Sequence, residues 1–330
     1  MANFPFATIE PNIGVVPVPD SRLDALSKIY NSPIVPATVE FVDIAGLIAG
    51  ASEGEGLGNK FLSHIRNTDA ISHVVRAFSD EDIVREGSIN PKSDLEIIET
   101  ELKLADLQTL EKQKDPGKTP DKELIKWWEV VQKLKAAVQE GKAVREVELS
   151  EEEVKIARQL SLLTAKPILV VLNVDEKDLV DSNKLELKFA QELELHASQV
   201  IAISAKVESE LASLSESDQK AYLGEIGVKA SGLERLIKKA FESLGLITFL
   251  TAGEKEVRAW TIKKDTRAQD AAGAIHTDFI KNFIKADIAK FEDFVELKGW
   301  KPCREAGKVR SEGRDYLMQD RDVVEFKIGV

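Results

Sequence analysis

The sequence has one cysteine and no long apolar run. A single thiol, Cys303, excludes a disulfide within the chain, and no group of histidines and cysteines has the spacing of a metal site. No apolar stretch approaches the roughly 20 residues of a membrane-spanning helix. The first residues, MANFPFATIEPN, have neither a basic start nor an apolar signal core. We therefore expect a cytoplasmic protein.

The charge of the chain also excludes some partners. The 330 residues carry a formal net charge of −12, and an acidic surface repels nucleic acids and anionic membranes. From Ile247 to the end, however, 16 basic residues balance 15 acidic ones, so the rest of the chain carries −13. This change predicts a separate C-terminal module. We expect neither DNA nor a membrane among the partners.

Short apolar segments alternate with helical patterns through much of the chain. Strands separated by helices are typical of an α/β fold with a parallel, doubly wound sheet. The expected strands are 39–43, 71–78, 167–172 and 200–203, and helices are expected over 59–69 and 231–244.

Two long charged helices interrupt this pattern. Ser93–Lys112 has its apolar residues on one stripe, and Asp121–Glu140 carries Trp127 and Trp128. The segment DPGKTP between them breaks the helix. We predict an antiparallel hairpin that projects from the sheet domain as an arm. A capping box at SEEE, residues 150–153, predicts a further helix.

After Gly245 the spacing changes again. Short strands are expected over 247–250, 259–262 and 323–328, and a helix over 268–284. This pattern predicts a small mixed α+β domain.

The motif D-x-x-G ends the first expected strand, at Asp43 and Gly46. In nucleotide switches such an aspartate reaches Mg²⁺ through water, and the glycine amide binds the γ-phosphate. Taken alone the motif is common, and an ordinary strand-to-loop turn is the alternative. Upstream, Thr8 lies where a first switch segment would place a threonine on the metal.

Two further motifs follow the next strands. Asn173, Val174 and Glu176 follow PILVVL, where GTPases carry N-K-x-D with an aspartate that accepts two hydrogen bonds from guanine. Because Glu176 is longer, the two-pronged guanine contact is in doubt. Residues 204–206, Ser204, Ala205 and Lys206, follow VIAI and match a loop whose backbone amides touch the base. The three motifs have the order and spacing of a nucleotide-binding domain.

These segments resemble the YchF/Obg-like ATPase family. Asn3–Asn12 is similar to its switch I, and Phe41–Asn59 to its switch II. The N-x-x-E sequence is the family's mark, and the resemblance implies ATP as substrate, with GTP possible. Thr251–Thr261 and Ala272–Phe279 resemble its TGS domain, a β-grasp fold. The similarity covers nearly the whole chain and is weakest in the arm.

The resemblance implies a domain plan and a set of site residues. A P-loop NTPase-like G domain would comprise 1–90 and 151–245, the helical arm 91–150 and the TGS domain 246–330. Thr8 and Asp43 would bind Mg²⁺, Asp43 and Gly46 would sense the γ-phosphate, and the base would meet Asn173, Val174, Glu176, Ser204, Ala205 and Lys206.

Slow hydrolysis is a further implication. Leu47 follows the D-x-x-G motif, where Ras-like proteins carry a glutamine that positions water, and an apolar side chain cannot do so. Family members often carry a histidine in the loop after the strand that matches ISHVVRAF. The nearest candidate here is Arg85, which puts that route to hydrolysis in doubt.

The sequence departs from the family at its start. The family opens with a strand, a G-x-x-x-x-G-K-S loop and a helix, and this chain has no G-x-x-x-x-G-K-[ST] anywhere. That loop supplies most of the phosphate binding. We therefore expect weak nucleotide binding and little hydrolysis from the chain as printed. A missing central strand would also leave two open strand edges.

Two functions remain open from the sequence. One is a slow ATPase switch that associates with the ribosome. The other is a nucleotide-independent module that binds a ribosome, RNA or another protein through the TGS domain and the arm. A basic stretch near the C-terminus favours the binding component. It comprises Lys298, Lys301, Arg304, Lys308, Arg310 and Arg314, against Glu305 and Glu312.

Overall fold

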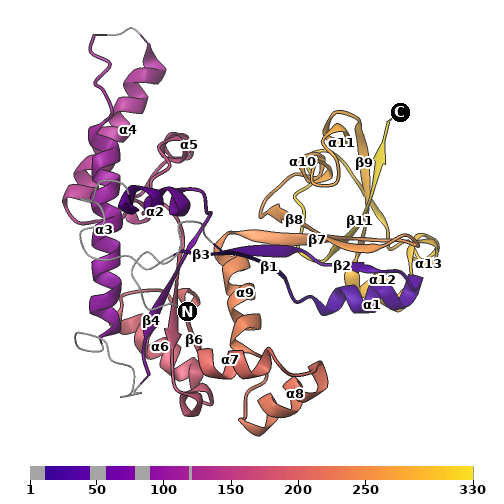
Figure 1. The fold of residues 1–330 in the computed structure, drawn as a ribbon. Helices are drawn as coiled ribbons and strands as arrows, with labels where there is room; N and C mark the ends of the chain where they lie inside the picture. Colours follow the sequence, from indigo (N-terminus) through magenta and orange to yellow (C-terminus); the bar gives the residue numbers. More distant parts are fainter. Residues whose placement is uncertain (1–11, 45–56, 79–89, 119–120, 330) are drawn as a thin grey trace. The chain divides into compact units, whose positions relative to one another are not determined.

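The computed structural model describes residues 12–44, 57–78, 90–118 and 121–329 (Figure 1). The chain forms two compact units. The first unit comprises the residues up to Gly14 and Val42–Arg235, and the second comprises Val15–Phe41 and Leu236–Val330. Within the described part of the chain, no helix is long and apolar enough to cross a membrane.

The first unit is built on a parallel sheet. Its strands are β4 (Ile71–Arg76), β5 (Ile168–Asn173) and β6 (Val200–Ile203), in that spatial order. β5 pairs in parallel with both neighbours. Its residues from Ile168 to Leu172 are all buried, as expected for a strand covered on both faces. The predicted parallel α/β sheet is confirmed.

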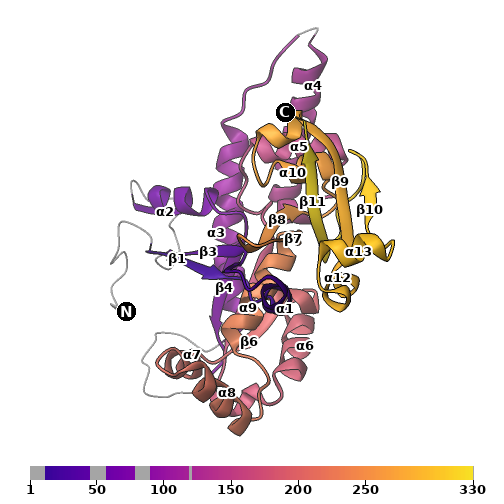
Figure 2. The same cartoon turned by 90° about the vertical axis from the view of Figure 1, so that its right-hand side faces the viewer.

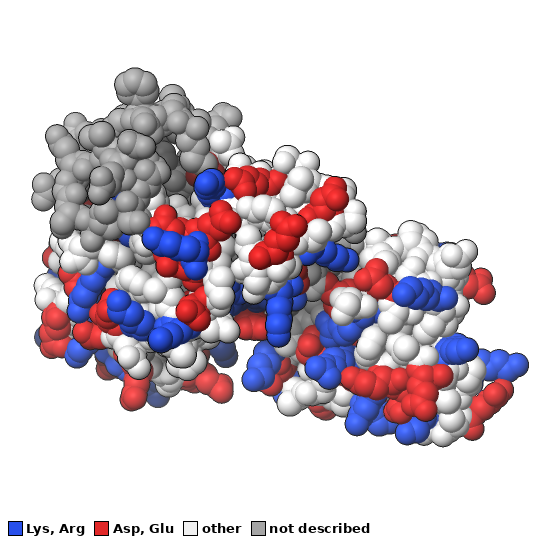
Figure 3. Space-filling model, turned by 90° about the horizontal axis from the view of Figure 1, so that it is seen from below, with Lys and Arg blue, Asp and Glu red and all other residues white. Residues whose placement is uncertain are grey.

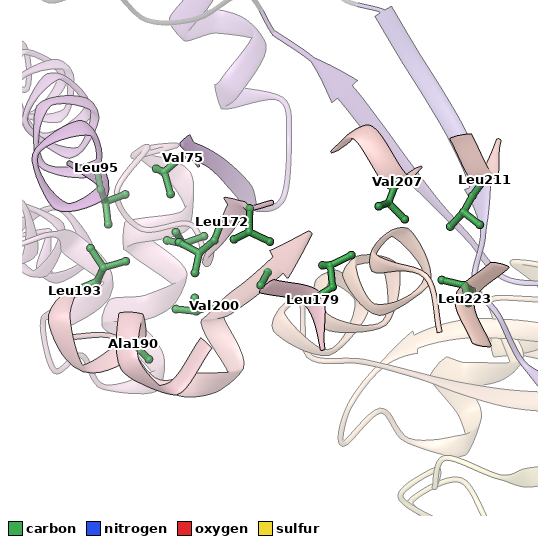
Figure 4. Packing of buried hydrophobic residues seen from close by; sticks show 13 residues of the cluster. Val75, Leu95, Leu172, Leu179, Ala190, Leu193, Val200, Val207, Leu211 and Leu223 are labelled. Atoms are coloured by element: carbon green, nitrogen blue, oxygen red, sulfur yellow. The ribbon is translucent and has the colours of Figure 1, made fainter. Parts of the chain in front are cut away.

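The first unit also contains helices. They are α2 (Leu57–Arg66), α5 (Glu151–Gln159), α6 (Ser182–Glu192), α7 (Ala205–Leu211) and α8 (Glu216–Glu225), with short 3₁₀ turns η1 (Val144–Glu146), η2 (Glu176–Leu179) and η3 (Ala197–Gln199). α9 (Gly232–Ser243) begins in the first unit and continues into the second. One core joins β4, β5 and β6 to α3 (Pro91–Glu111), α6, α7 and α8. Leu95 and Leu193 lie toward one end of it, and Leu211 and Leu223 toward the other (Figure 4).

A two-stranded sheet stands apart from these strands. β1 (Asn12–Pro17) pairs with β3 (Thr38–Asp43). Among the described residues β3 has no pairing with β4, and β4 pairs only with β5. Val74 on β4 is 68% exposed. The sequence predicted open strand edges at this place, and no described strand pairs with β4 on the side away from β5.

The predicted helical arm is present. α3 (Pro91–Glu111) packs on α4 (Lys122–Gln139). Asn90 and Asp121 cap the two helices by accepting hydrogen bonds from backbone amides of the first turn. The buried apolar residues of α4 and the end of α3 form a core that excludes water: Leu110, Val130, Val131, Leu134 and Val138. The capping box also forms, because Ser150 and Glu153 each accept from the other's backbone amide.

The second unit is a six-stranded sheet with helices on both faces (Figure 2). Its order is β10-β9-β11-β7-β8-β2. The strands are β2 (Ile34–Val35), β7 (Leu246–Ala252), β8 (Val257–Lys263), β9 (Phe283–Lys290), β10 (Arg310–Glu312) and β11 (Asp322–Ile328). The helices are α1 (Ser21–Tyr30), α10 (Ala268–Ala272), α11 (Asp278–Lys281), α12 (Phe291–Leu297) and α13 (Trp300–Glu305).

The single helix predicted over 268–284 is wrong. The segment contains α10, a break, α11 and then the start of β9. Gly273 ends α10, and a Cβ atom there would lie 2.6 Å from Cδ1 of Ile280. Because glycine has no Cβ, Ile280 of α11 can pack directly against the end of α10. A continuous helix would keep the two segments apart. Both helices cover one apolar face of the sheet.

Residues 15–41 pack with the C-terminal sheet, which the sequence analysis did not anticipate. Asp20 caps α1, and β2 pairs in parallel with β8 at Ile34 and Val257. Leu23 and Leu26 of α1 are buried against the sheet face that α12 and α13 cover. A segment between the two predicted switch regions thus belongs structurally to the second unit.

Candidate nucleotide-binding site

A pocket opens at the carboxyl ends of β4, β5 and β6. Its volume is about 920 Å³. Ligands of open α/β sheets bind at this edge because the loops that follow the strands converge there. The lining residues are Phe78, Asn173, Val174, Asp175, Glu176, Lys177, Val180, Ser204, Ala205, Lys206, Glu225 and Ile226. All six residues predicted to face a base are among them.

Asn173 joins the loops of this pocket. Its side-chain Oδ1 accepts a hydrogen bond from the backbone amide of Ala205 at 3.0 Å. Its carbonyl accepts from the amide of Ala77 at 2.9 Å, and the next amide, of Val174, donates to Ile203 at 2.9 Å. Asn173 therefore braces the loop after β6, so one side chain fixes the relation of the second and third motifs.

The walls of the pocket differ in character. Val174 and Ser204 are buried, each 2% exposed, and form its floor. Glu176 is the first residue of η2 and half-buried. Lys177 and Lys206 are exposed at the rim. A flat heterocycle needs apolar surface for its faces and a few polar groups for its edge, and this lining offers both.

Sequence reasoning missed part of the lining. Phe78 follows β4, and the guanidinium of Arg76 lies 4.6 Å from its ring centre. Val180, Glu225 and Ile226 come from η2's end and from α8. Phe78 could have been found, because an aromatic residue just after a predicted strand lies at the same sheet edge as the two base motifs. The α8 residues carry no such signal.

The predicted phosphate and metal residues are less completely described. Asp43 is the last residue of β3 and is exposed. Thr8, Gly46 and Leu47 lie outside the described residues, as does Arg85. Within the described ranges no cluster of three or more histidine, cysteine, aspartate or glutamate side chains could hold a metal ion. The magnesium ligands Thr8 and Asp43 therefore stay predictions.

Asn173→Ala tests the joint between the loops. Removal of the amide leaves the Ala205 N–H without its acceptor and frees the loop after β6, so we expect adenosine affinity to fall on the order of tenfold. Thermal unfolding should shift little, because Asn173 is half-buried at a loop. Calorimetry with adenosine, compared with a rim variant Lys177→Ala, measures the effect. Equal affinity of both variants would contradict this role of Asn173.

Comparison with known proteins places the chain. A protein named ribosome-binding ATPase YchF from Bacillus subtilis (strain 168) is 47% identical over 337 residues, which span 100% of this chain and 92% of that protein. The chain belongs to the YchF family. The protein of the same name from Escherichia coli O157:H7 is 45% identical over 335 residues, again with 100% and 92% covered.

Other findings agree with membership of the YchF family. The solved structure of the Schizosaccharomyces pombe YchF GTPase matches with a TM-score of 0.82 and 36% identity, over 99% of this chain and 90% of that one. Residues 1–114 match a family described as 50S ribosome-binding GTPase. Residues 246–329 match the YchF GTPase C-terminal family, described as a protein of unknown function. The fold is the α/β nucleotide-binding fold that the YchF resemblance implied.

Proposed function

We propose that this chain is a nucleotide switch for ATP, with GTP possible, that associates with the ribosome. Because the printed sequence has no G-x-x-x-x-G-K-[ST] loop, we expect the chain to bind ATP weakly and to hydrolyse little of it. The joint between Asn173 and Ala205 at the mouth of the base pocket carries the nucleotide part. The names of the B. subtilis and E. coli relatives support ATP and the ribosome. Association with the ribosome implies a location in the cytoplasm. Residues 246–330, which supply most of the second unit, would be the TGS domain, with 91–150 as the arm and 1–90 with 151–245 as the G domain, although 15–41 pack in the second unit.

The site residues divide into a base end and a phosphate end. At the base end, Val174 would present its backbone to the ring, and Glu176 would accept from its edge. At the phosphate end, Asp43 and Thr8 would hold Mg²⁺, which would neutralise charge on the β- and γ-phosphates. Asp43 fits this role because it is an exposed carboxylate at the carboxyl end of a strand. Leu47, four residues further along the chain, has an apolar side chain that cannot orient water, so hydrolysis would be slow.

Adenosine and guanosine carry no phosphate, so their affinities test the base end of the site alone. Shortening the acid in Glu176→Asp should restore a two-pronged contact with the N1 and N2 donors of guanine. We expect the ratio of guanosine to adenosine affinity to rise on the order of tenfold. Glu176→Gln, which keeps the length and removes the charge, is the control. A ratio that is the same in the Asp variant as in the parent would show that Glu176 does not face the base edge.

The phosphate end has a separate test. The printed sequence has no G-x-x-x-x-G-K-[ST] loop, whose backbone amides and lysine bind phosphates. We expect Mg·ATP and adenosine to bind this chain with affinities within about threefold of each other, because the base would then supply nearly all the binding. Calorimetry with both ligands measures this. Micromolar Mg·ATP affinity, abolished by Asp43→Asn, would instead mean that other residues bind the phosphates.

A further inference from the structure

The tip of the helical arm carries four lysines for which the described residues offer no ion-pair partner. Lys112, Lys114, Lys118 and Lys122 lie at the end of α3, in the connection and at the first residue of α4. All four are exposed, and within the described residues none forms an ion pair or side-chain hydrogen bond. This connection lies at the end of the arm remote from β4 and β6 (Figures 1 and 2).

The lysines of the arm's stem contrast with them. Lys126 pairs with Glu152, and Lys133 lies 3.0 Å from Glu153. Three others also have partners: Lys135 with Glu111, Lys142 with Glu140 and Lys103 with the carbonyl of Gly141. Along this hairpin the paired lysines thus lie on the stem, and the lysines without a partner among the described residues lie at the tip.

Nearby acids reduce the charge of the tip without cancelling it, because residues 112–122 hold four lysines against Asp115 and Asp121, a net of +2. Asp115 accepts from the amide of Gly117, and Asp121 accepts from the amides of Glu123 and Leu124. These carboxylates shape the turn and cap α4. The chain as a whole carries −12, so an unpaired basic tip is a local exception. On the face shown in Figure 3, by comparison, basic and acidic side chains are interleaved.

The basic stretch near the C-terminus is a weaker candidate than the sequence indicated. Arg304 pairs with Glu325, Lys308 lies 3.1 Å from Asp293, and Arg310 lies 3.3 Å from Glu312. Half of its six cations are thus neutralised by neighbouring acids. Each pair would have to break before these cations could bind a phosphate, and that lowers the gain from binding.

Two apolar side chains adjoin the lysines. Leu124 and Ile125, in the first turn of α4, are 46% and 40% exposed. The inward face of α4 is already filled by the arm's own core, which includes Val130 and Val131. The two exposed residues therefore add contact surface beside the charged group rather than stability to the arm.

We propose that this tip docks on the phosphate backbone of folded RNA, with Lys112, Lys114, Lys118 and Lys122 each facing phosphates. A lysine binds phosphate as a point charge, whereas base edges are read mostly by arginine, asparagine and glutamine in fixed geometry. The described tip has no arginine, so the contact is independent of sequence. The inference rests on the proposed ribosome association, which supplies such RNA, and it assigns the contact to the arm.

The test uses the full chain with all four tip lysines changed to glutamine. Purified ribosomes and protein-free ribosomal RNA are the two probes, each titrated at several salt concentrations. We expect the variant to bind both on the order of 30-fold more weakly at about 0.1 M salt, with the log–log salt slope reduced by about 3, because up to four phosphate contacts are lost. Leu124→Ser with Ile125→Ser should weaken binding a few-fold without changing the slope.

The matched control changes the stem lysines Lys126, Lys133, Lys135 and Lys142 to glutamine. It removes the same charge but should change affinity less than about threefold, since these lysines are held in ion pairs. Equal thermal midpoints of tip and stem variants establish that both are folded. If the tip and stem variants lose affinity equally, the net charge of the chain and not the tip determines binding, and the proposal is wrong.

The remaining outcomes distinguish failure of the docking proposal from failure of the proposed function. If the parent chain binds ribosomes and the tip variant binds them equally, the proposal is wrong and the proposed function stands. If the parent binds ribosomes but not the free RNA, and the tip variant loses ribosomes, an acidic protein surface is the partner and the RNA assignment is wrong. If the parent binds neither probe, the ribosome part of the proposed function fails and the docking proposal fails with it.

Discussion

Replacement of Asp106 by alanine is expected to lower the free energy of unfolding by about 4 kcal/mol. Asp106, on α3, is fully buried. Its carboxylate accepts from the amide of Leu163 at 2.7 Å and from the amide and hydroxyl of Thr164 at 2.8 and 2.7 Å. Alanine leaves three donors without an acceptor in a buried site, and each unsatisfied donor costs about 1–3 kcal/mol.

The same carboxylate organises a wider junction. The Thr164 hydroxyl also accepts from the amide of Val144, and the Thr164 carbonyl accepts from the amide of Arg145. Asp106 therefore connects the arm helix α3, η1 and the segment that leads into β5. Loss of the junction should loosen the base of the arm together with the start of β5.

Two measurements check this effect. Urea unfolding gives the free energy, with the exposed helix variant Glu96→Ala as control, and hydrogen exchange at Leu163 and Thr164 reports the junction itself. Local exchange matters because two units need not unfold in a single transition. A free-energy loss below about 1 kcal/mol, with unchanged exchange at both amides, would contradict the proposed role of Asp106.

The pH dependence of this group has a definite sign. Burial raises the pKa of Asp106 above its usual value, although the hydrogen bonds from Thr164 and Leu163 oppose that rise. Because the folded state then holds its proton to higher pH than the unfolded state, the contribution of this carboxyl to stability decreases as pH rises from 3.8 through the folded pKa. Asp106 thus works against acid unfolding.

Much of this architecture could be predicted because its signals are local. The strands β5 and β6 are short apolar segments that can be recognised without knowing what packs against them. The apolar residues of α3 recur at helical spacing, and two of them, Leu102 and Ala105, are buried in the core. Asp106 looked like another charged residue of an exposed helix. Its partners at 163 and 164 lie 57 and 58 residues away, and no spacing rule connects them.

The errors and omissions arise from distant contacts as well. β2 pairs with β8 although more than 200 residues separate them, as the register of Ile34 with Val257 shows. Nothing in the sequence of either segment identifies the other as its partner. The broken helix at Gly273 depends on the approach of Ile280. In the pocket, motifs gave the polar residues, whereas Phe78 and Ile226 arrive there only through the fold.

Glu99 should confer stability that acid removes. Its carboxylate, on α3, pairs with Arg145 at 2.5 Å, and its other oxygen lies 3.2 Å from Nε2 of His73, which is buried on β4. The 3.2 Å contact is an ion pair when His73 is protonated, but it lacks hydrogen-bond geometry. Burial opposes ionisation of Glu99, but His73 and Arg145 outweigh it and hold the pKa below its usual value.

The sign for Glu99 is opposite to that for Asp106. A depressed pKa in the folded state gives stability that is present above 4.5, the ordinary value, and is lost as pH falls through the folded pKa. Glu99→Gln leaves Arg145 without its counter-charge in a largely buried site. We expect it to cost about 3 kcal/mol at neutral pH, and to cost progressively less as the parent chain itself loses the carboxylate in acid.

A double-mutant cycle separates the pair from simple loss of packing. Urea unfolding of the parent, Glu99→Gln, Arg145→Gln and the double variant, at neutral pH and at a series of pH values below 4.5, gives the coupling energy at each pH. A buried pair should show coupling above about 1.5 kcal/mol at neutral pH that decreases as pH falls through the folded pKa of Glu99, whereas the exposed pair of Glu152 with Lys126 should show less than about 1 kcal/mol at neutral pH. Coupling that stays constant with pH would mean that the charge on Glu99 does not hold α3 to η1. The arm would then be anchored to the sheet domain through Asp106 and apolar contact alone.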